Sequence, residues 1–173
     1  MVKHSQFAPQ FDQNSRQGFT LVELLIVISI IGILARFLFV NFAEVRIRGR
    51  DTQRKNDLTQ VKKALRLYYN DYQSYPAHDE ANRILGCGSD GAEPCAWGSP
   101  FETGSTTYMG ELPADPINIG AQVYSYEQVD GGEDFRLTAN LENKSDQQAV
   151  PSQERCGIVE DEIDDSTFMI CAN

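Results

Sequence analysis

The stretch that decides the fold is residues 15–39, SRQGFTLVELLIVISIIGILARFLF, where one acidic residue interrupts an almost continuous apolar run. The run covers residues 21–40, and about twenty apolar residues suffice for a helix to cross a bilayer. Glu23 lies near its start, although an ionised carboxylate at the centre of such a helix costs roughly 2.5 to 3.5 kcal/mol on insertion scales. Glu23 is therefore a candidate functional residue.

A second helical pattern follows the apolar run. Apolar and aromatic side chains recur there at spacings of three and four residues, as on one helix face, at Leu58, Val61, Leu65, Tyr68 and Tyr72. Neither proline nor glycine interrupts residues 51–74, and Pro76 indicates the stop. We therefore predict one helix over residues 19–74, whose second part packs on a globular domain.

The partner of that helix face is predicted to be a small antiparallel sheet. In residues 121–141, AQVYSYEQVDGGEDFRLTANL, two alternating stretches flank a turn at Asp130-Gly131-Gly132. Tyr124 and Tyr126 alternate on the first strand, and Phe135, Leu137, Ala139 and Leu141 alternate on the second. A third short strand is predicted over residues 167–171, and residues 86–118 read as a loop rich in Gly, Pro, Ser and Glu.

The charge is unevenly placed along the chain. The formal net charge is −10, but residues 67–173 hold twenty acidic and only four basic residues. Residues 46–66 hold eight basic residues against two acidic ones, and these could touch anionic lipid headgroups just outside a membrane span. An acidic globular part disfavours nucleic acid as a primary ligand, because such ligands need a basic surface.

The four cysteines all follow the apolar segment, and an even number in an exported domain indicates disulfides. Four cysteines allow three pairings, of which we favour the two that are local in sequence, Cys87 with Cys95 and Cys156 with Cys171. A zinc site is disfavoured because no C-x-x-C spacing occurs and the chain has only two histidines.

An ordinary secretory signal fits the start of the chain badly, because no small-residue cleavage site follows the apolar core. A plain membrane anchor leaves Glu23 unexplained. The sequence Gly18-Phe19-Thr20-Leu21-Val22-Glu23, followed by an apolar run, resembles the processing site of type IV pilins and type II secretion pseudopilins. The resemblance implies cleavage between Gly18 and Phe19 by the prepilin peptidase, and N-methylation of Phe19.

The resemblance continues through most of residues 18–143, and it thins in the last thirty residues. RDTQRKNDLTQVKKALRLYYNDYQSYP looks like the exposed helix of these proteins, and LPADP, YSYE and DGGEDFRLTANLEN look like their sheet. It implies an α+β, type IV pilin-like fold: a long N-terminal helix on a small antiparallel sheet with a disulfide-closed C-terminal loop. The implied parts are a leader (1–18), a transmembrane and assembly helix (19–43) and a globular domain (44–173) that includes the exposed helix (44–75).

The function that this resemblance implies is structural rather than enzymatic. It implies a homo-oligomeric helical filament, either a type II secretion pseudopilus in the periplasm or a type IV pilus outside the cell; both remain open. Before assembly the chain would cross the inner membrane once, with its globular domain outside the cytoplasm, and meet an inner-membrane assembly platform. No nucleophile elbow or phosphate-binding loop points to catalysis.

Cleavage would explain Glu23 physically. It creates an α-amine on Phe19, protonated at neutral pH, which Glu23 of the same helix cannot easily reach. A neighbouring subunit, staggered along a filament, can offer its Phe19 amine to this carboxylate, so that joining the filament neutralises a buried charge. Two alternatives stay open: Glu23 reaches the membrane interface, or the chain is a membrane-anchored periplasmic ligand-binding domain that does not polymerise.

Three features depart from the family pattern or extend it. Val40 stands where the family commonly has a proline, and Arg36 is a charge within the apolar run that either reaches the outer interface or pairs with Glu23 of another subunit. Major pseudopilins similar to this chain bind calcium in a C-terminal loop. Asp161, Asp164 and Asp165 are therefore calcium candidates, although a solvated acidic loop fits their spacing better.

Overall fold

The computed structural model describes residues 18–120 and 122–172, without the side chains of residues 37–41. It separates into two compact units, Met1–Phe42 and Ala43–Asn173. Helix α1 (Leu21–Tyr72) contributes to both units, and it is continuous through the position of Val40, whose side chain lies outside the described residues. The helix ends where Gln73 adopts a positive φ of 54° and its N–H bonds the Tyr69 carbonyl.

Within the described residues, eight short strands and one further α-helix follow α1. They form three antiparallel sheets: β1–β2–β3, β4–β5 and β6–β7–β8. The strands are β1 (Ala77–His78), β2 (Ile84–Cys87), β3 (Glu93–Pro94), β4 (Phe101–Thr103), β5 (Thr106–Met109), β6 (Ser125–Val129), β7 (Asp134–Asn140) and β8 (Thr167–Ile170). Helix α2 (Ala149–Arg155) precedes β8, and two 3-10 turns are η1 (Asp130–Gly132) and η2 (Glu160–Glu162).

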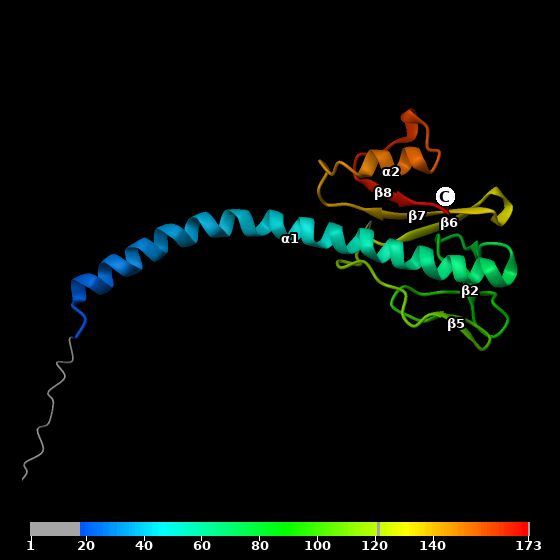
Figure 1. The fold of residues 1–173 in the computed structure, drawn as a ribbon, viewed down its shortest axis with the longest axis horizontal. Helices are drawn as coiled ribbons and strands as arrows, with labels where there is room; N and C mark the ends of the chain where they lie inside the picture. Colours follow the sequence, from blue (N-terminus) through cyan, green and yellow to red (C-terminus); the bar gives the residue numbers. More distant parts are fainter. Residues whose placement is uncertain (1–17, 121, 173) are drawn as a thin grey trace, which may run out of the picture. The chain divides into compact units, whose positions relative to one another are not determined.

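The core of the second unit lies between α1 and the sheets, as the helical period predicted. Leu58, Val61 and Leu65 are fully buried on α1, whereas Tyr72, in the last turn, is half exposed. Within this unit α1 has the β6–β7–β8 sheet on one side and the part of the chain that holds β2 and β5 on the other (Figure 1). Helix α2 lies beyond the β6–β7–β8 sheet. The α+β fold with a long N-terminal helix is thereby confirmed.

The predicted hairpin is present, with β6 paired to β7 in the register Tyr126–Leu137. All six of the alternating side chains named above are buried. The turn uses positive φ at three successive residues, and at Gly132 (φ 99°) a Cβ would lie 2.0 Å from Oγ of Ser74. Because the Tyr75 N–H also donates to the Gly132 carbonyl at 2.8 Å, this glycine lets the hairpin approach the end of α1.

The segment 86–118 differs from the loop that its composition predicted, because it contains β3, β4, β5 and the end of β2. These strands are only two to four residues long, too short to show an alternating pattern in the sequence. The Cys87–Cys95 disulfide joins the end of β2 to the residue after β3, and the buried ring of Phe101 at the start of β4 packs in the core.

The C-terminal part holds the second disulfide, Cys156–Cys171, and the predicted third strand, β8, which pairs with β7. The buried side chain of Gln153 holds the loop between α2 and β8 in place. Gln153 Nε2 donates to the carbonyls of Asp164 (2.7 Å) and Thr167 (2.8 Å), and its Oε1 accepts the Asp164 N–H at 3.0 Å. Hydrogen bonds between the loop backbone and the side chain of Gln153 on α2 therefore hold the disulfide-closed loop in place.

Candidate functional site

Helix α1 begins with reciprocal hydrogen bonds between Thr20 and Glu23. The Thr20 N–H and hydroxyl donate to Oε2 of Glu23 at 3.0 and 2.8 Å, and the Glu23 N–H donates to the Thr20 hydroxyl oxygen at 3.2 Å. In this capping box each residue satisfies a group of the other that has no partner inside the helix. Glu23 therefore has a local structural role, and both of the bonds its carboxylate accepts here use one oxygen.

The apolar side chains after the capping box are exposed within the first unit. From Phe19 to Leu34, the large apolar side chains expose between 48% (Val27) and 88% (Phe19) of their surface. An apolar surface of this extent is normally covered by lipid or by another protein chain. Within the described part of the chain, no helix reaches both the length and the apolar character required of a membrane span.

The predicted cleavage junction lies just before α1, in non-helical chain. Gly18 and Phe19 are both exposed, and a Cβ built on Gly18 would meet no heavy atom within 4 Å. The junction is therefore accessible from several sides. Residues 1–17, the rest of the predicted leader, lie outside the described residues, and Arg36 is exposed.

A buried charge network lies in the second unit, centred on Arg54. The side chain of Arg54 is fully buried, and its Nε and Nη2 donate to the two carboxylate oxygens of Asp115 at 2.6 and 3.0 Å. Its Nη1 donates to Asp51 and Glu142, both at 2.7 Å. One guanidinium thus links α1 to the segment before β6 and to the segment after β7. Because Arg54 is buried, it is not among the basic side chains of residues 46–66 that could touch lipid headgroups.

The carboxylates of this network also accept backbone N–H groups. Asp51 accepts those of Glu142 (3.0 Å) and Asn143 (2.9 Å), and Asp115 accepts that of Ile117 (2.8 Å). Charge-assisted bonds of this kind are stronger than neutral ones, and each one here joins segments that lie apart in the sequence or tightens a turn. The network therefore fixes how α1 sits on the sheet of its own unit.

Hydrogen bonds within the network favour the charged forms of Glu142, Asp115 and Arg54. The bonds from Arg50, reinforced by Arg54, lower the pKa of Glu142 from 4.5 to about 2. Burial raises the pKa of Asp115, but the bonds from Arg54 and from the backbone outweigh it and hold that pKa below its ordinary value. Burial lowers the pKa of Arg54, but the hydrogen bonds to its three carboxylate partners outweigh burial and raise that pKa above its usual value.

The three calcium candidates lie in the loop between α2 and β8. Asp161 belongs to η2, and Asp161 and Asp165 are exposed. The Asp164 carboxylate accepts the Ser166 N–H at 3.0 Å and the hydroxyls of Ser166 and Thr167 at 2.9 Å, bonds that lower its pKa. Among the described residues, no three His, Cys, Asp or Glu side chains group closely enough to hold a metal ion.

Sequence reasoning missed two features of these sites for different reasons. The capping box was visible, since Thr20 and Glu23 stand in the spacing T-x-x-E before an apolar run. The burial of Arg54 left no comparable local signal, because its partner Asp115 lies 61 positions away.

The first match to known proteins covers the start of the chain. Residues 13–35 match the family model described as the prokaryotic N-terminal methylation motif. The type II secretion system core protein G of Klebsiella pneumoniae is 32% identical over 118 residues, which cover 66% of this chain and 81% of that protein. No solved structure shows a significant match to the chain.

Two type IV pilus proteins are similar over shorter stretches. The major pilin of Myxococcus xanthus is 35% identical over 83 residues, which cover 48% of this chain and 34% of that protein. A major component of the type IV wide pilus of Thermus thermophilus is 43% identical over 70 residues, which cover 40% and 53% respectively. This chain thus spans about a third of the Myxococcus pilin and about half of the Thermus protein.

Proposed function

The chain belongs to the family of type IV pilins and type II secretion pseudopilins, and from this membership we propose that it polymerises through the first part of α1. Its role is that of a structural subunit in a pilin-like filament, either a pseudopilus that serves protein secretion or a type IV pilus. The relatives are pilins and secretion-system core proteins, and the proposal is accordingly of a structural and not a catalytic role.

The observation that carries the proposal is the exposed apolar surface of the first unit. Twelve large apolar side chains between Phe19 and Leu34 are about half exposed or more. Burial of such area is worth about 25 cal/mol per Å², so that these side chains are stabilised once lipid or neighbouring helices cover them. We propose that the inner membrane covers them first and that the same helix of other subunits covers them in the filament.

Processing prepares the helix for this exchange. We propose that the prepilin peptidase cuts between Gly18 and Phe19 and that Phe19 is then N-methylated. The exposure of both residues, together with the absence of a side chain on Gly18, supports access of an enzyme to the peptide bond. The match of residues 13–35 to the N-terminal methylation motif supports the same step.

Glu23 is proposed to select the position of the incoming subunit. After cleavage the Phe19 amine of a neighbour carries a positive charge, and a carboxylate buried among apolar helices is its natural partner. The capping box supports this role, because both Thr20 donors bond to Oε2 and thereby orient the carboxylate at the start of the helix. The other oxygen, Oε1, is then proposed to receive the amine.

The proposed path of the chain runs from membrane to filament. It enters the inner membrane as a single span over residues 19–43, with the globular unit outside the cytoplasm, and an inner-membrane assembly platform lifts it into the filament. The partners are thus the prepilin peptidase, that platform and further copies of this chain, and nucleic acid is not proposed as a primary ligand. Calcium at Asp161, Asp164 and Asp165 is not part of the proposal.

The test compares Glu23→Leu with Glu44→Leu, a control in which the lost carboxylate is exposed and lies beyond the apolar run. Glu23→Leu should still be cleaved, and mass spectrometry should find methylated Phe19 at its new amino terminus. It should be strongly under-represented in sheared filaments, because leaving one member of a buried pair uncompensated typically costs about 3 to 5 kcal/mol. Glu44→Leu should assemble normally.

Three results would count against the proposal. An unprocessed amino terminus in the wild-type chain would refute cleavage at Gly18. Normal assembly of Glu23→Leu would refute the pairing with the Phe19 amine, and a processed chain that never enters filaments would favour the anchored binding domain.

A further inference from the structure

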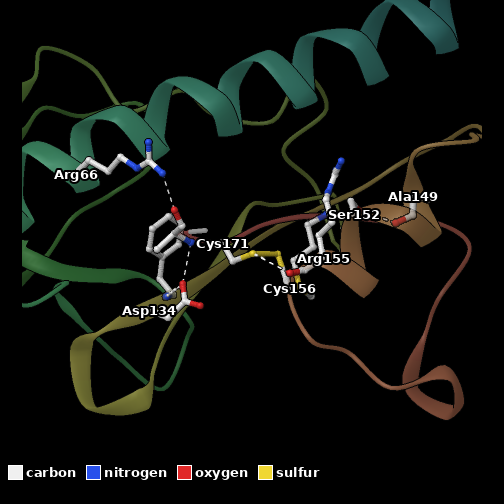
Figure 2. Close-up of a disulfide and its surroundings, with 10 residues drawn as sticks. Arg66, Asp134, Ala149, Ser152, Arg155, Cys156 and Cys171 are labelled. Carbon is white, nitrogen blue, oxygen red and sulfur yellow. Dashed lines mark hydrogen bonds between the residues drawn. A yellow bond between two sulfur atoms is a disulfide. The ribbon is translucent and has the colours of Figure 1, made fainter.

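A groove lies between α1 and the C-terminal disulfide in the second unit. It has a volume of about 500 Å³, and its floor is formed by β8 and by Cys156–Cys171. Figure 2 shows Arg66 on α1 and Arg155 on α2 on either side of this disulfide. The residues that define this cationic groove are Lys62, Lys63, Arg66, Arg155, Phe168 and Ile170.

The cationic groove stands out against the charge of the rest of the unit. It gathers four basic side chains, three from α1 and one, Arg155, from the acidic part of the chain, where residues 67–173 contain four basic residues against twenty acidic ones. Lys63 and Arg155 are exposed, and no ion pair joins either of them to a carboxylate among the described residues. Burial lowers the pKa of Lys62, and the nearby charges of Arg66 and Arg155 lower it further against the opposing effect of Asp134. An acidic ligand would relieve this repulsion.

An acidic surface, opposite in charge to the groove, lies in the loop between Cys156 and β8. Its exposed carboxylates are Glu160, Asp161, Glu162, Asp164 and Asp165. This acidic loop extends from the disulfide on the side away from α1 (Figures 1 and 2). The bonds of Gln153 to the backbone of Asp164 and Thr167 hold the loop there, so it does not fold back over the groove of its own chain.

We propose that the cationic groove binds the acidic loop of a second copy of this chain. The inference rests on the proposed function, in which copies of the chain stack in a filament, and it adds a contact between globular units to the contact between helices. Opposite charges on two different surfaces of one chain favour this occupant, because complementary patches steer association and fix register.

The geometry of such a contact suits a filament. The groove and the loop are different surfaces, so the contact is head-to-tail, and each copy that binds through its groove leaves its own acidic loop available to the next. A contact of this type generates an open helical assembly when its rotation does not close a ring, whereas a contact between identical patches ends at a dimer. The cationic groove therefore supplies directional growth outside the membrane.

The test uses charge reversal on each surface of the full-length chain. The groove variant is Lys63→Glu with Arg155→Glu, and the loop variant is Asp161→Lys with Asp165→Lys; all four side chains are exposed. Each variant alone should lower the yield of sheared filaments by about tenfold or more, since like charges then face each other across the contact. A matched control, Glu80→Lys with Glu111→Lys, changes the net charge as the loop variant does, at exposed sites elsewhere, and should assemble normally.

Co-expression of the two variants distinguishes a contact between copies from a fault within one chain. The acidic groove of one variant then meets the basic loop of the other, and the basic groove meets an acidic loop, so filament yield should return close to that of the wild type. Failure of this rescue, or normal assembly of either variant alone, would overturn the proposed contact.

A cross-linking measurement separates this inference from the proposed function. A carbodiimide joins lysine amines to carboxylates in contact, so it should give covalent dimers of the wild-type chain that either reversal removes. The pair Lys55 and Asp146, 2.6 Å apart within one chain, is an internal control that cannot give dimers. Wild-type filaments without these dimers would refute the groove contact alone. Failure of the wild type to form filaments would refute the proposed function, and dimers in its membranes would still support the contact.

Discussion

Replacing Arg54 with methionine should destabilise the second unit by about 3 kcal/mol, because three carboxylates lose their shared cation. Methionine fills a similar space with apolar atoms, so the effect measures the charge and its hydrogen bonds more than lost packing. A loss of this size matters in a small domain, whose free energy of unfolding is typically 5 to 15 kcal/mol.

The structure shows which carboxylate suffers most. Glu142 keeps the bond from Nε of Arg50 at 2.6 Å, and Asp51 keeps two backbone donors. Asp115, which is 4% exposed, loses both guanidinium bonds and keeps only backbone N–H groups. The typical cost of breaking a buried pair is about 3 to 5 kcal/mol, and the remaining donors place Arg54→Met at the lower end of that range.

Urea unfolding of the full-length chain in detergent, followed by the fluorescence of Trp97, provides the assay. Trp97 is the chain's single tryptophan, and its ring lies 5.6 Å from that of Tyr124 in the core of the second unit. The matched control is Arg48→Met on the same helix. Arg48 pairs with Glu44 in an exposed i,i+4 ion pair, which is worth only about 0.3 to 0.5 kcal/mol.

A second substitution tests the mechanism itself. Adding Asp115→Asn to Arg54→Met removes the uncompensated charge and should recover part of the lost stability, with a coupling energy within the 0.5 to 3 kcal/mol usual for contacting residues. The reasoning is wrong if Arg54→Met unfolds within about 0.5 kcal/mol of Arg48→Met, the scale of ordinary surface substitutions. It is also wrong if Asp115→Asn deepens the defect of the methionine variant.

Gly132→Ala should destabilise the second unit by about 2 kcal/mol or more, because a Cβ would lie 2.0 Å from a side-chain oxygen and φ is 99°. Gly131→Ala, whose Cβ would meet open space, should lose less stability in the same urea assay. An equal loss in the two variants would contradict the packing argument. Removing Cys156–Cys171 by serine substitution should destabilise the unit by roughly 3 kcal/mol, since a loop of about 15 residues loses its closure, and unchanged thermal unfolding would refute this. The pKa of Glu142 is lower in the folded chain than its ordinary 4.5, so its contribution to stability is present above pH 4.5 and is lost as the pH falls toward about 2. In Glu142→Gln, the free energy of unfolding should therefore change less with pH across this range.

Local sequence patterns were enough to predict α1 and the three strands β6, β7 and β8, but not α2 or the shorter strands. Contacts between residues three and four positions apart define α1, and alternation defines β6 and β7 (residues 121–141 of the prediction). These patterns survive folding because they describe neighbours along one element. The loop prediction for residues 86–118 was wrong because strands of two to four residues are too short to show an alternating pattern in the sequence.

Tertiary structure alone decided which charges are used for stability and which remain available for partners. Arg54 and Lys63 stand in the same basic stretch, yet the first is buried against Asp115, 61 positions away, and the second is exposed at the cationic groove. The sequence alone was enough to find the apolar run and the glutamate within it, because both are defined by neighbours along the chain. Burial of a charge depends on segments that meet only after the chain has folded, and no local pattern records that meeting.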